Sequence, residues 1–340
     1  MNDMKSECVD WKVLEGARVL VTGASGLVGT ACVRALLARH DQFGERISVV
    51  AVVRNRAKAE RKFADYVGRD DFELLVADLS EPFTMDGKVD FIIHCAGVTG
   101  NPKLFVDAPV EVLTTAYVST KSVLELARVK KSVGVVYLSS WEVYGLPPIG
   151  SKLIDESYSG YINLSDVRTS YKESKRLGEQ LCVAYAKEYG VPVKIGRISI
   201  TSGPGFDESD KRFLPQFVRS AIAGEDIVLR STGETVRSHV YLDDCVTALL
   251  TILLRGGVGE AYNIADPDAT YSIAEIAKII AGEGGVNVVF DLTADQAKLG
   301  YNGQVKAVLD ASKLLALGWR PQTTFKEMIH KMIEGYASEQ

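Results

Sequence analysis

The sequence predicts an α/β fold: a doubly wound parallel sheet with helices on both faces, joined to a smaller C-terminal α/β domain. Short apolar runs rich in β-branched residues alternate with longer amphipathic stretches over roughly the first 200 residues, a pattern typical of parallel strands joined by right-handed crossover helices. The first apolar run breaks into three glycines and then into a helical run, as a strand, a tight turn and a helix require. With 340 residues, the chain is long enough for about two domains.

The expected strands and helices follow in order along the chain. Mainly apolar runs, which suit strands buried in a parallel sheet, occur at 17–21, 47–53, 72–76, 89–95, 133–138 and 191–198, and the run at 47–53 is the most continuously apolar. Runs with helical periodicity occur at 30–39, 110–129 and 169–188. From residue 201 the elements become shorter, and we expect them at 212–223, 227–230, 272–281 and 325–336. The predicted domains are residues 1–200 plus roughly 236–260, and residues 201–235 plus 261–340.

The glycine turn after the first strand predicts a dinucleotide site of the Rossmann type. Gly23 allows a sharp turn, Gly26 lets backbone N–H groups approach a pyrophosphate, and Gly29 lets the helix pack closely on the strand. The positive end of the helix dipole then faces the anion. Ligands of such sheets bind at the carboxyl ends of the strands. The residues expected there for the cofactor are Gly23, Ser25, Gly26, Leu27, Val28, Gly29, Arg54, Asp78, Leu79, Ala96 and Gly97.

The end of the second strand leaves the choice between NAD and NADP open. An acidic residue at this place would bind the ribose hydroxyls of NAD, but the sequence has Arg54. Arg54 could bind the 2′-phosphate of NADP, stack on the adenine, or be a solvated charge. Asp78, after the third strand, could reach the adenine or could cap a helix.

A tyrosine, a lysine and a serine are the candidates for catalysis. Tyr171 and Lys175 are four residues apart in an expected helix, so their side chains share one face. A phenol with the ordinary pKa of about 10 is a poor base at neutral pH, and a nearby ammonium lowers this pKa. Ser140 ends the fifth strand, where its hydroxyl could polarise a substrate oxygen. The pair could also be a surface contact, and the serine could be a turn cap.

Several motifs in the same order resemble the extended short-chain dehydrogenase/reductase family, within it the nucleotide-sugar epimerases and dehydratases. They are the glycine turn, the block 139–145, Tyr171 with Lys175, the Gly-Pro-Gly at 203–205, Arg237 before 240–244, and the segment 317–321. The resemblance implies that Tyr171 is the base and that Lys175 holds the cofactor ribose and lowers the phenol pKa. It also implies that Ser140 bonds the reacting oxygen and that the cofactor is bound NAD.

The resemblance implies a nucleoside-diphosphate sugar as substrate. Arg237 resembles the arginine with which the family binds the diphosphate, which suits a guanidinium fork, although an interface ion pair is the alternative. The loop 160–168 lies between the serine block (residues 139–145) and the expected helix that carries Tyr171 (the tyrosine helix, 169–188), and it is expected to overlie the substrate. The candidate substrate-binding residues are Ser140, Trp141, Asn163, Phe213 and Arg237. Arg197 is assigned to structure.

The residues after Ser140 bear on the reaction. The 4,6-dehydratases of this family typically have Asp-Glu there, whereas this chain has Trp141 and Glu142, and an indole cannot protonate a leaving hydroxyl. Epimerisation at sugar C4 of a UDP- or dTDP-hexose needs no further acid, so it is the favoured interpretation. Glu142 as a catalytic residue also suits a decarboxylase of nucleotide-linked uronic acids, which is the alternative together with a 4,6-dehydratase. An NADPH-dependent 4-keto sugar reductase and a non-catalytic dinucleotide sensor are further alternatives.

Composition predicts a cytoplasmic protein without nucleic-acid or membrane partners. The 39 basic and 44 acidic residues give a net charge of −5, and neither sign forms a long block. Five scattered cysteines favour reduced thiols over disulfides or a metal site. Residues 1–14 lack the apolar stretch of a secretory signal. The resemblance adds the expectation of a homodimer formed through the two helices that flank the sheet.

Overall fold

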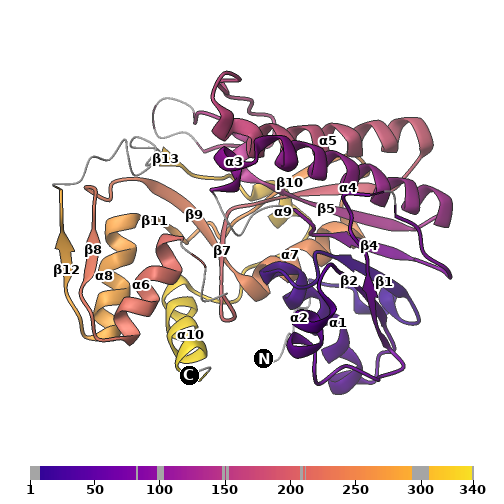
Figure 1. Cartoon of the computed structure of the whole chain (residues 1–340), viewed down its shortest axis with the longest axis horizontal. Helices are drawn as coiled ribbons and strands as arrows, with labels where there is room; N and C mark the ends of the chain where they lie inside the picture. The colour runs from indigo at the N-terminus through magenta and orange to yellow at the C-terminus, as the bar shows by residue number, and fades with distance from the viewer. Residues whose placement is uncertain are drawn as a thin grey trace.

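A seven-stranded parallel sheet forms the larger part of the molecule (Figure 1). The computed structural model describes residues 8–81, 83–97, 103–147, 150, 153–206, 210, 212–292 and 306–338. The strands are β1 (Arg18–Thr22), β2 (Ser48–Val53), β3 (Phe72–Val76), β4 (Phe91–His94), β5 (Gly134–Ser140), β6 (Val193–Ile198) and β10 (Ala261–Ile264). Their order is β10-β6-β5-β4-β1-β2-β3. The order reverses between β1 and β4, which confirms the predicted doubly wound sheet and places the ligand crevice at this point.

Helices cover both faces of the sheet because successive strand residues point to opposite sides. Val19 and Val21 of β1 share a core with α1 (Leu27–Phe43), α2 (Arg56–Lys62) and α7 (Leu242–Arg255). Leu20, between them, belongs to the core on the other face. That face is covered by three helices, α3 (Leu104–Asp107), α4 (Pro109–Lys130) and α5 (Ser170–Tyr189). Since both faces are buried, the strand sequences are almost continuously apolar.

The smaller part of the molecule has its own core on one side of the large sheet (Figure 1). Its helices are α6 (Phe213–Ile222), α8 (Ile273–Gly284) and α10 (Phe325–Ser338). Two small sheets accompany them, one of β8 (Ile227–Leu229) and β12 (Val288–Phe290), the other of β7 (Ile200–Ser202), β9 (Val236–Tyr241), β11 (Thr270–Ser272) and β13 (Lys306–Ala307). The short helix α9 (Ser312–Ala316) contacts β10.

The chain passes between the large sheet and the four-stranded sheet, here called the smaller sheet, at points other than the predicted domain boundaries. Residues 236–241 were predicted to belong to the dinucleotide domain, but they form β9 of the smaller sheet. Residues 261–264 were placed with the second domain, but as β10 they pair with β6 in the large sheet. β9 leads directly into α7, which packs under the large sheet. The division into two domains therefore stays a prediction, with β9 and β10 exchanged between its parts.

The glycine turn is as tight as its spacing predicts. Gly23 has φ +63°, and a Cβ there would lie 2.7 Å from the Ala96 backbone nitrogen. A Cβ at Gly29 would lie 2.3 Å from the Gly23 carbonyl oxygen. Gly26 is the N-cap of α1. Only glycine permits these backbone approaches between β1, the segment after β4, and α1.

The substitution Gly29→Ala is expected to lower the free energy of unfolding by about 1–3 kcal/mol, because the new methyl group would force α1 away from the turn. The matched control is Gly282→Ala in α8, where a Cβ would meet no atom within 4 Å. That change should stabilise the protein by up to about 1 kcal/mol through helix propensity. Urea titrations of both variants measure the difference, and equal shifts would contradict the close approach at Gly29.

Candidate active site

The carboxyl end of β5 carries the serine block. Ser140 is the last residue of β5 and caps a short 3-10 helix (Trp141–Tyr144), in which its Oγ accepts a hydrogen bond from the Glu142 backbone nitrogen at 3.2 Å. The prediction that Ser140 caps a turn is therefore confirmed. It does not exclude a catalytic role, because the hydroxyl proton is still available for donation.

Tyr171 lies in the first turn of α5 and faces the serine block. Its ring stacks on Phe105 of α3, with the centroids 4.7 Å apart and the planes at 14°. Burial raises the pKa of Tyr171, and the Glu142 carboxylate raises it further, whereas a side-chain interaction with Ser140 lowers it. The tertiary structure thus brings the Ser140 and Glu142 side chains to the phenol.

Lys175 lies one turn after Tyr171 and is buried. Its Nζ donates to the Leu138 carbonyl oxygen at 2.7 Å and lies 5.0 Å from the centre of the Tyr137 ring. A Cβ added at Gly97 would be 3.4 Å from Nζ, so the ammonium faces the end of β4. Burial lowers the pKa of Lys175 to about 8.

The expected lowering of the Tyr171 pKa by Lys175 is not found. The phenol pKa is raised, mainly by burial, and Ser140 and Arg212 are the groups that lower it. The reason is the position of the ammonium, which bonds the Leu138 carbonyl of β5. A shared helix face therefore brings the two residues to one crevice without bringing their charged ends together.

Glu142 is surrounded by cationic side chains. It is partly buried, and desolvation raises the pKa of its carboxyl, while Lys172, Arg168 and Arg237 lower it. The three cations come from α5, from the segment before α5, and from β9. A carboxyl group with a raised pKa holds its proton closer to neutral pH than an exposed glutamate does.

Arg237 reaches the serine block from the smaller sheet. Its guanidinium carbon lies 4.7 Å from the centre of the Trp141 ring. Burial lowers the pKa of Arg237 to about 10, and Glu142 opposes this shift, so the side chain is still positively charged at pH 7. Trp141 and Arg237, both predicted substrate residues, are thus brought together.

Two predicted substrate residues make local contacts. The Asn163 side chain is exposed and accepts a hydrogen bond from the Ser165 backbone nitrogen at 3.1 Å, which stabilises its own turn. Phe213, in the first turn of α6, packs on Phe217 with ring centroids 5.6 Å apart. Their substrate roles stay predictions. The neighbouring Arg168 and Arg212 act on Glu142 and Tyr171 respectively.

A buried polar network lies behind the serine block and was not predicted. Ser139 Oγ donates to Glu179 Oε1 at 2.5 Å. Arg197 forms an ion pair with Glu179 at 2.7 Å and donates to the Tyr144 hydroxyl at 3.0 Å. These contacts tie β5, α5 and β6 together, so Arg197 serves structure as expected. Because Glu179 is four residues after Lys175 and eight after Tyr171 on α5, helical periodicity could have found it.

The predicted cofactor residues lie along the strand ends. Leu27 and Val28 begin α1, and the Ser25 carbonyl accepts a hydrogen bond from Lys62 Nζ at 3.0 Å. The Ala96 backbone nitrogen donates to Thr22 Oγ1 at 3.2 Å. Leu79 is buried in the core under α4 and α5.

Arg54 and Asp78 lie at the exposed ends of neighbouring strands, β2 and β3. The Ser80 backbone nitrogen donates to Asp78 at 2.9 Å and lowers the pKa of this carboxyl, and Arg54 lowers it further. Asp78 thus caps a turn, whereas the sequence had offered a helix cap as the alternative, and no described helix begins directly after it.

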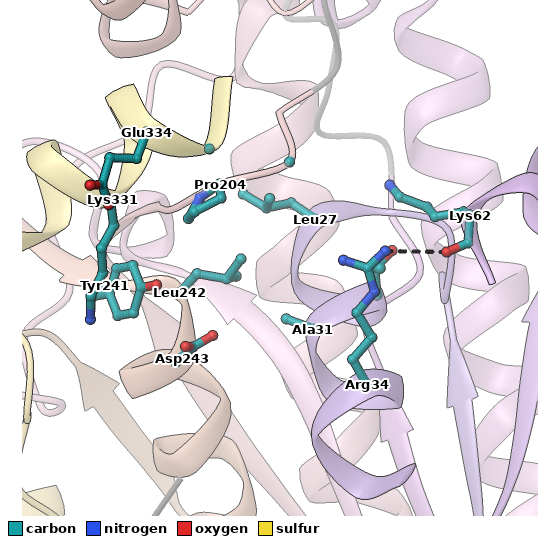
Figure 2. A pocket seen from close by; sticks show the side chains of 13 residues that line it. Leu27, Ala31, Arg34, Lys62, Pro204, Tyr241, Leu242, Asp243, Lys331 and Glu334 are labelled. Atoms are coloured by element: carbon teal, nitrogen blue, oxygen red, sulfur yellow. Dashed lines mark hydrogen bonds between the residues drawn. The ribbon is translucent and has the colours of Figure 1, made fainter. Parts of the chain in front are cut away.

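A cavity of about 570 Å³ lies beside the first turn of α1. Figure 2 shows Arg34 and Lys62 on one of its walls and Lys331 with Tyr241 on the other. Its described lining residues are Leu27, Thr30, Ala31, Arg34, Lys62, Pro204, Gly205, Tyr241, Leu242, Asp243, Lys331, Glu334 and Gly335. Of these, Leu27 alone was predicted as a site residue, and Ser140, Tyr171 and Lys175 do not line this cavity.

Within the described ranges, no group of three or more His, Cys, Asp or Glu side chains is placed to hold a metal ion. Among the helices that the structure describes, none is both long and apolar enough to cross a bilayer.

Comparisons with known proteins agree on one family. The NAD dependent epimerase/dehydratase family matches residues 19–265. The chain is 30% identical to UDP-glucuronic acid decarboxylase 1 of Xenopus tropicalis over 325 residues, which cover 95% of this chain and 72% of that protein. Proteins of the same activity from Danio rerio and Arabidopsis thaliana are 28% identical.

Solved structures show the same fold. The dTDP-glucose 4,6-dehydratase DesIV of Streptomyces venezuelae, with NAD and TYD bound, has a TM-score of 0.78 and 25% identity, covering 94% of this chain and 97% of that one. The UDP-glucose 4-epimerase of Thermotoga maritima has a TM-score of 0.79 and 19% identity, covering 95% and 99%.

Retention of a dinucleotide is expected to depend on pH through Lys175. Burial lowers the pKa of this group to about 8, so the ammonium is charged below pH 8 and loses its charge as the pH rises through that value. The dissociation constant for the dinucleotide should therefore rise above pH 8. Lys175→Arg should bind without this pH dependence, because a guanidinium stays charged, and Lys175→Met should bind weakly throughout. Calorimetric titrations from pH 6 to 9.5 measure this, and a flat profile for the unmodified protein would contradict it.

Proposed function

Because this chain belongs to the NAD-dependent epimerase/dehydratase family, we propose that it decarboxylates a nucleoside-diphosphate-linked uronic acid through transient oxidation at sugar C4. The 4-epimerase interpretation favoured by the sequence is less well supported, since the curated relatives named above are decarboxylases. The alternative that the sequence left open, a decarboxylase that uses Glu142, is better supported than the 4-epimerase.

The observation that carries this proposal is the environment of Glu142. Decarboxylation of a uronic acid starts from an anionic sugar and ends with a proton on C5. The cations Arg168, Lys172 and Arg237 act on the Glu142 carboxyl and would favour an anionic substrate beside it. The raised pKa of Glu142 suits a group that holds the proton destined for C5. Simple 4-epimerisation requires no group that delivers a proton to C5.

The residues at the strand ends fit NAD. The glycine turn exposes its backbone at the start of α1. A side chain at Gly23 would clash with the Ala96 backbone, and one at Gly29 would clash with the Gly23 carbonyl. Such a turn at a helix N-terminus binds a pyrophosphate. Lys175, facing Gly97, would hold the nicotinamide ribose. When bound, NAD supplies the hydride acceptor and donor for C4.

Tyr171 would transfer the proton of the sugar 4-hydroxyl, and Ser140 would hydrogen-bond the same oxygen. Tyr171 is buried, and its phenol interacts with the Ser140 side chain. Ser140 would donate a hydrogen bond to the C4 oxygen, and Tyr171 in its ionised, phenolate form would accept the proton of the 4-hydroxyl and later return it. A carboxylate attached next to an oxidised C4 leaves as carbon dioxide readily, because the ketone accepts the electron pair that stays on C5. Arg237 would bind the diphosphate.

Incubation with UDP-glucuronic acid, without added dinucleotide, is expected to release carbon dioxide and to give a UDP-pentose. Mass spectrometry of the products measures this. An unchanged mass with inverted C4 would indicate an epimerase, loss of water a dehydratase, and net NADPH consumption a reductase, and each would contradict the proposal.

Two variants serve as controls for that reaction. Tyr171→Phe should lose most turnover, by about 10²–10⁴-fold for a lost acid–base group, while it still binds the dinucleotide. Unchanged turnover in this variant would remove Tyr171 from the mechanism and would favour a sensor without chemistry. Glu142→Gln should slow carbon dioxide release more than it weakens UDP binding.

We also propose a homodimer formed through α4 and α5. Val110, Leu113 and Tyr117 follow one another at helical spacing on α4 and are exposed, and Leu177 of the adjacent α5 is exposed as well. A contiguous apolar face of this kind marks an association surface. Sedimentation velocity should show a dimer, and Tyr117→Glu should shift it toward the monomer. A monomer at all concentrations of the unmodified protein would dismiss this assembly.

A further inference from the structure

The aromatic residue at position 141 lies where the two sheets of the molecule meet. Trp141 follows Ser140 directly and begins the short 3-10 helix after β5. Its half-buried indole packs on a small apolar cluster consisting of Val143, Tyr144, Ile154, Ala265, Ala307 and Leu309. Ala307 belongs to β13, which pairs with β9 opposite Arg237. The indole therefore packs against Val143 and Tyr144 of its own 3-10 helix and against Ala307 of the smaller sheet.

The contact between Trp141 and Arg237 restrains the guanidinium over the indole ring. The guanidinium carbon lies 4.7 Å from the ring centre, within the range of a cation–π interaction. Arg237 Nη1 also donates to the Val236 carbonyl oxygen at 3.0 Å. These two contacts restrain a long side chain that otherwise has many rotamers.

The orientation matters because of how arginine binds phosphate. All five N–H donors of a guanidinium lie in its plane, and bidentate binding of phosphate oxygens uses an edge of that plane. Stacking on an aromatic ring uses the face of the plane instead. Trp141 can therefore hold the cation without competing for the donors that a diphosphate needs.

We propose that Trp141 is a positioning residue that orients Arg237 for the diphosphate of the nucleotide sugar. This inference rests on the proposed function, in which Arg237 binds that diphosphate. It assigns to Trp141 a role that an acidic or small residue at the same place could not perform, since neither offers an aromatic face.

The test measures binding of UDP and of uridine by calorimetry to the purified protein with its dinucleotide bound. Trp141→Leu keeps an apolar side chain against the cluster but removes the aromatic face. The dissociation constant for UDP is expected to rise about three- to thirty-fold in this variant, the range that corresponds to a cation–π contact. The constant for uridine, which has no diphosphate, should stay the same.

A second variant separates the aromatic face from the indole N–H, which has no hydrogen-bond acceptor among the described residues. Trp141→Phe keeps a face and lacks the N–H group, so it should bind UDP nearly as well as the unmodified protein. If Trp141→Phe loses as much affinity as Trp141→Leu, the stacking role is overturned. Melting temperatures and retained dinucleotide verify that each variant is folded.

A double-mutant cycle shows whether Trp141 acts through Arg237. In an Arg237→Gln background, Trp141→Leu should cause no further loss of UDP affinity. Additive losses would overturn the proposal, because they would mean that the two side chains act independently. With substrate, Trp141→Leu should raise KM and change kcat little.

The outcomes also separate this inference from the proposed function. If the unmodified protein releases carbon dioxide and Trp141→Leu leaves UDP binding unchanged, the inference alone is overturned. If the protein releases no carbon dioxide but loses UDP affinity in Trp141→Leu only when Arg237 is present, the inference is supported and the decarboxylase is overturned. Absence of UDP binding by the unmodified protein would overturn both.

Discussion

The buried ion pair between Arg197 and Glu179 holds the serine block and the tyrosine helix in one arrangement. Two charges removed from water require close pairing and additional hydrogen bonds, and here Ser139 and Tyr144 supply them. These partners come from β5, from the 3-10 helix after it, from α5 and from β6. The relative position of Ser140 and Tyr171 therefore depends on a network in which neither takes part.

Burial shifts the pKa of four groups near Ser140, in opposite directions for acids and bases. It raises the pKa of Tyr171 and Glu142, and it lowers the pKa of Lys175 and Arg237. Each shift reduces the cost of holding a charge in a desolvated place. Groups whose pKa values are shifted by burial and by nearby charges are typical of sites where protons are moved.

The two sheets contribute different parts of the proposed chemistry. In the large sheet, the glycine turn and Ser140 follow the carboxyl ends of β1 and β5, near the point where the strand order reverses, and Tyr171 lies on the adjacent helix α5. The smaller sheet sends Arg237 to the serine block, where it meets Trp141. This division explains how relatives with decarboxylase, epimerase and dehydratase activities share one fold, since the reaction depends on a few side chains placed at the junction.

The sequence alone determined the doubly wound sheet, the long helices α1, α4 and α5, the glycine turn and the family. Apolar runs, helical periodicity and the spacing of glycines and motif residues are local patterns along the chain. The short elements α2, α3 and β7 and the membership of β9 and β10 were not predicted, because short segments carry little periodicity. The helix α7 was missed as well, because it is buried on almost all sides and its sequence lacks a polar face. Only the tertiary structure decided that Phe105 stacks on Tyr171, that Lys175 bonds a strand carbonyl instead of lowering the phenol pKa, and that Arg237 lies on Trp141. Those contacts join residues far apart in the chain, and the pKa values follow from burial, which exists only once the chain has folded.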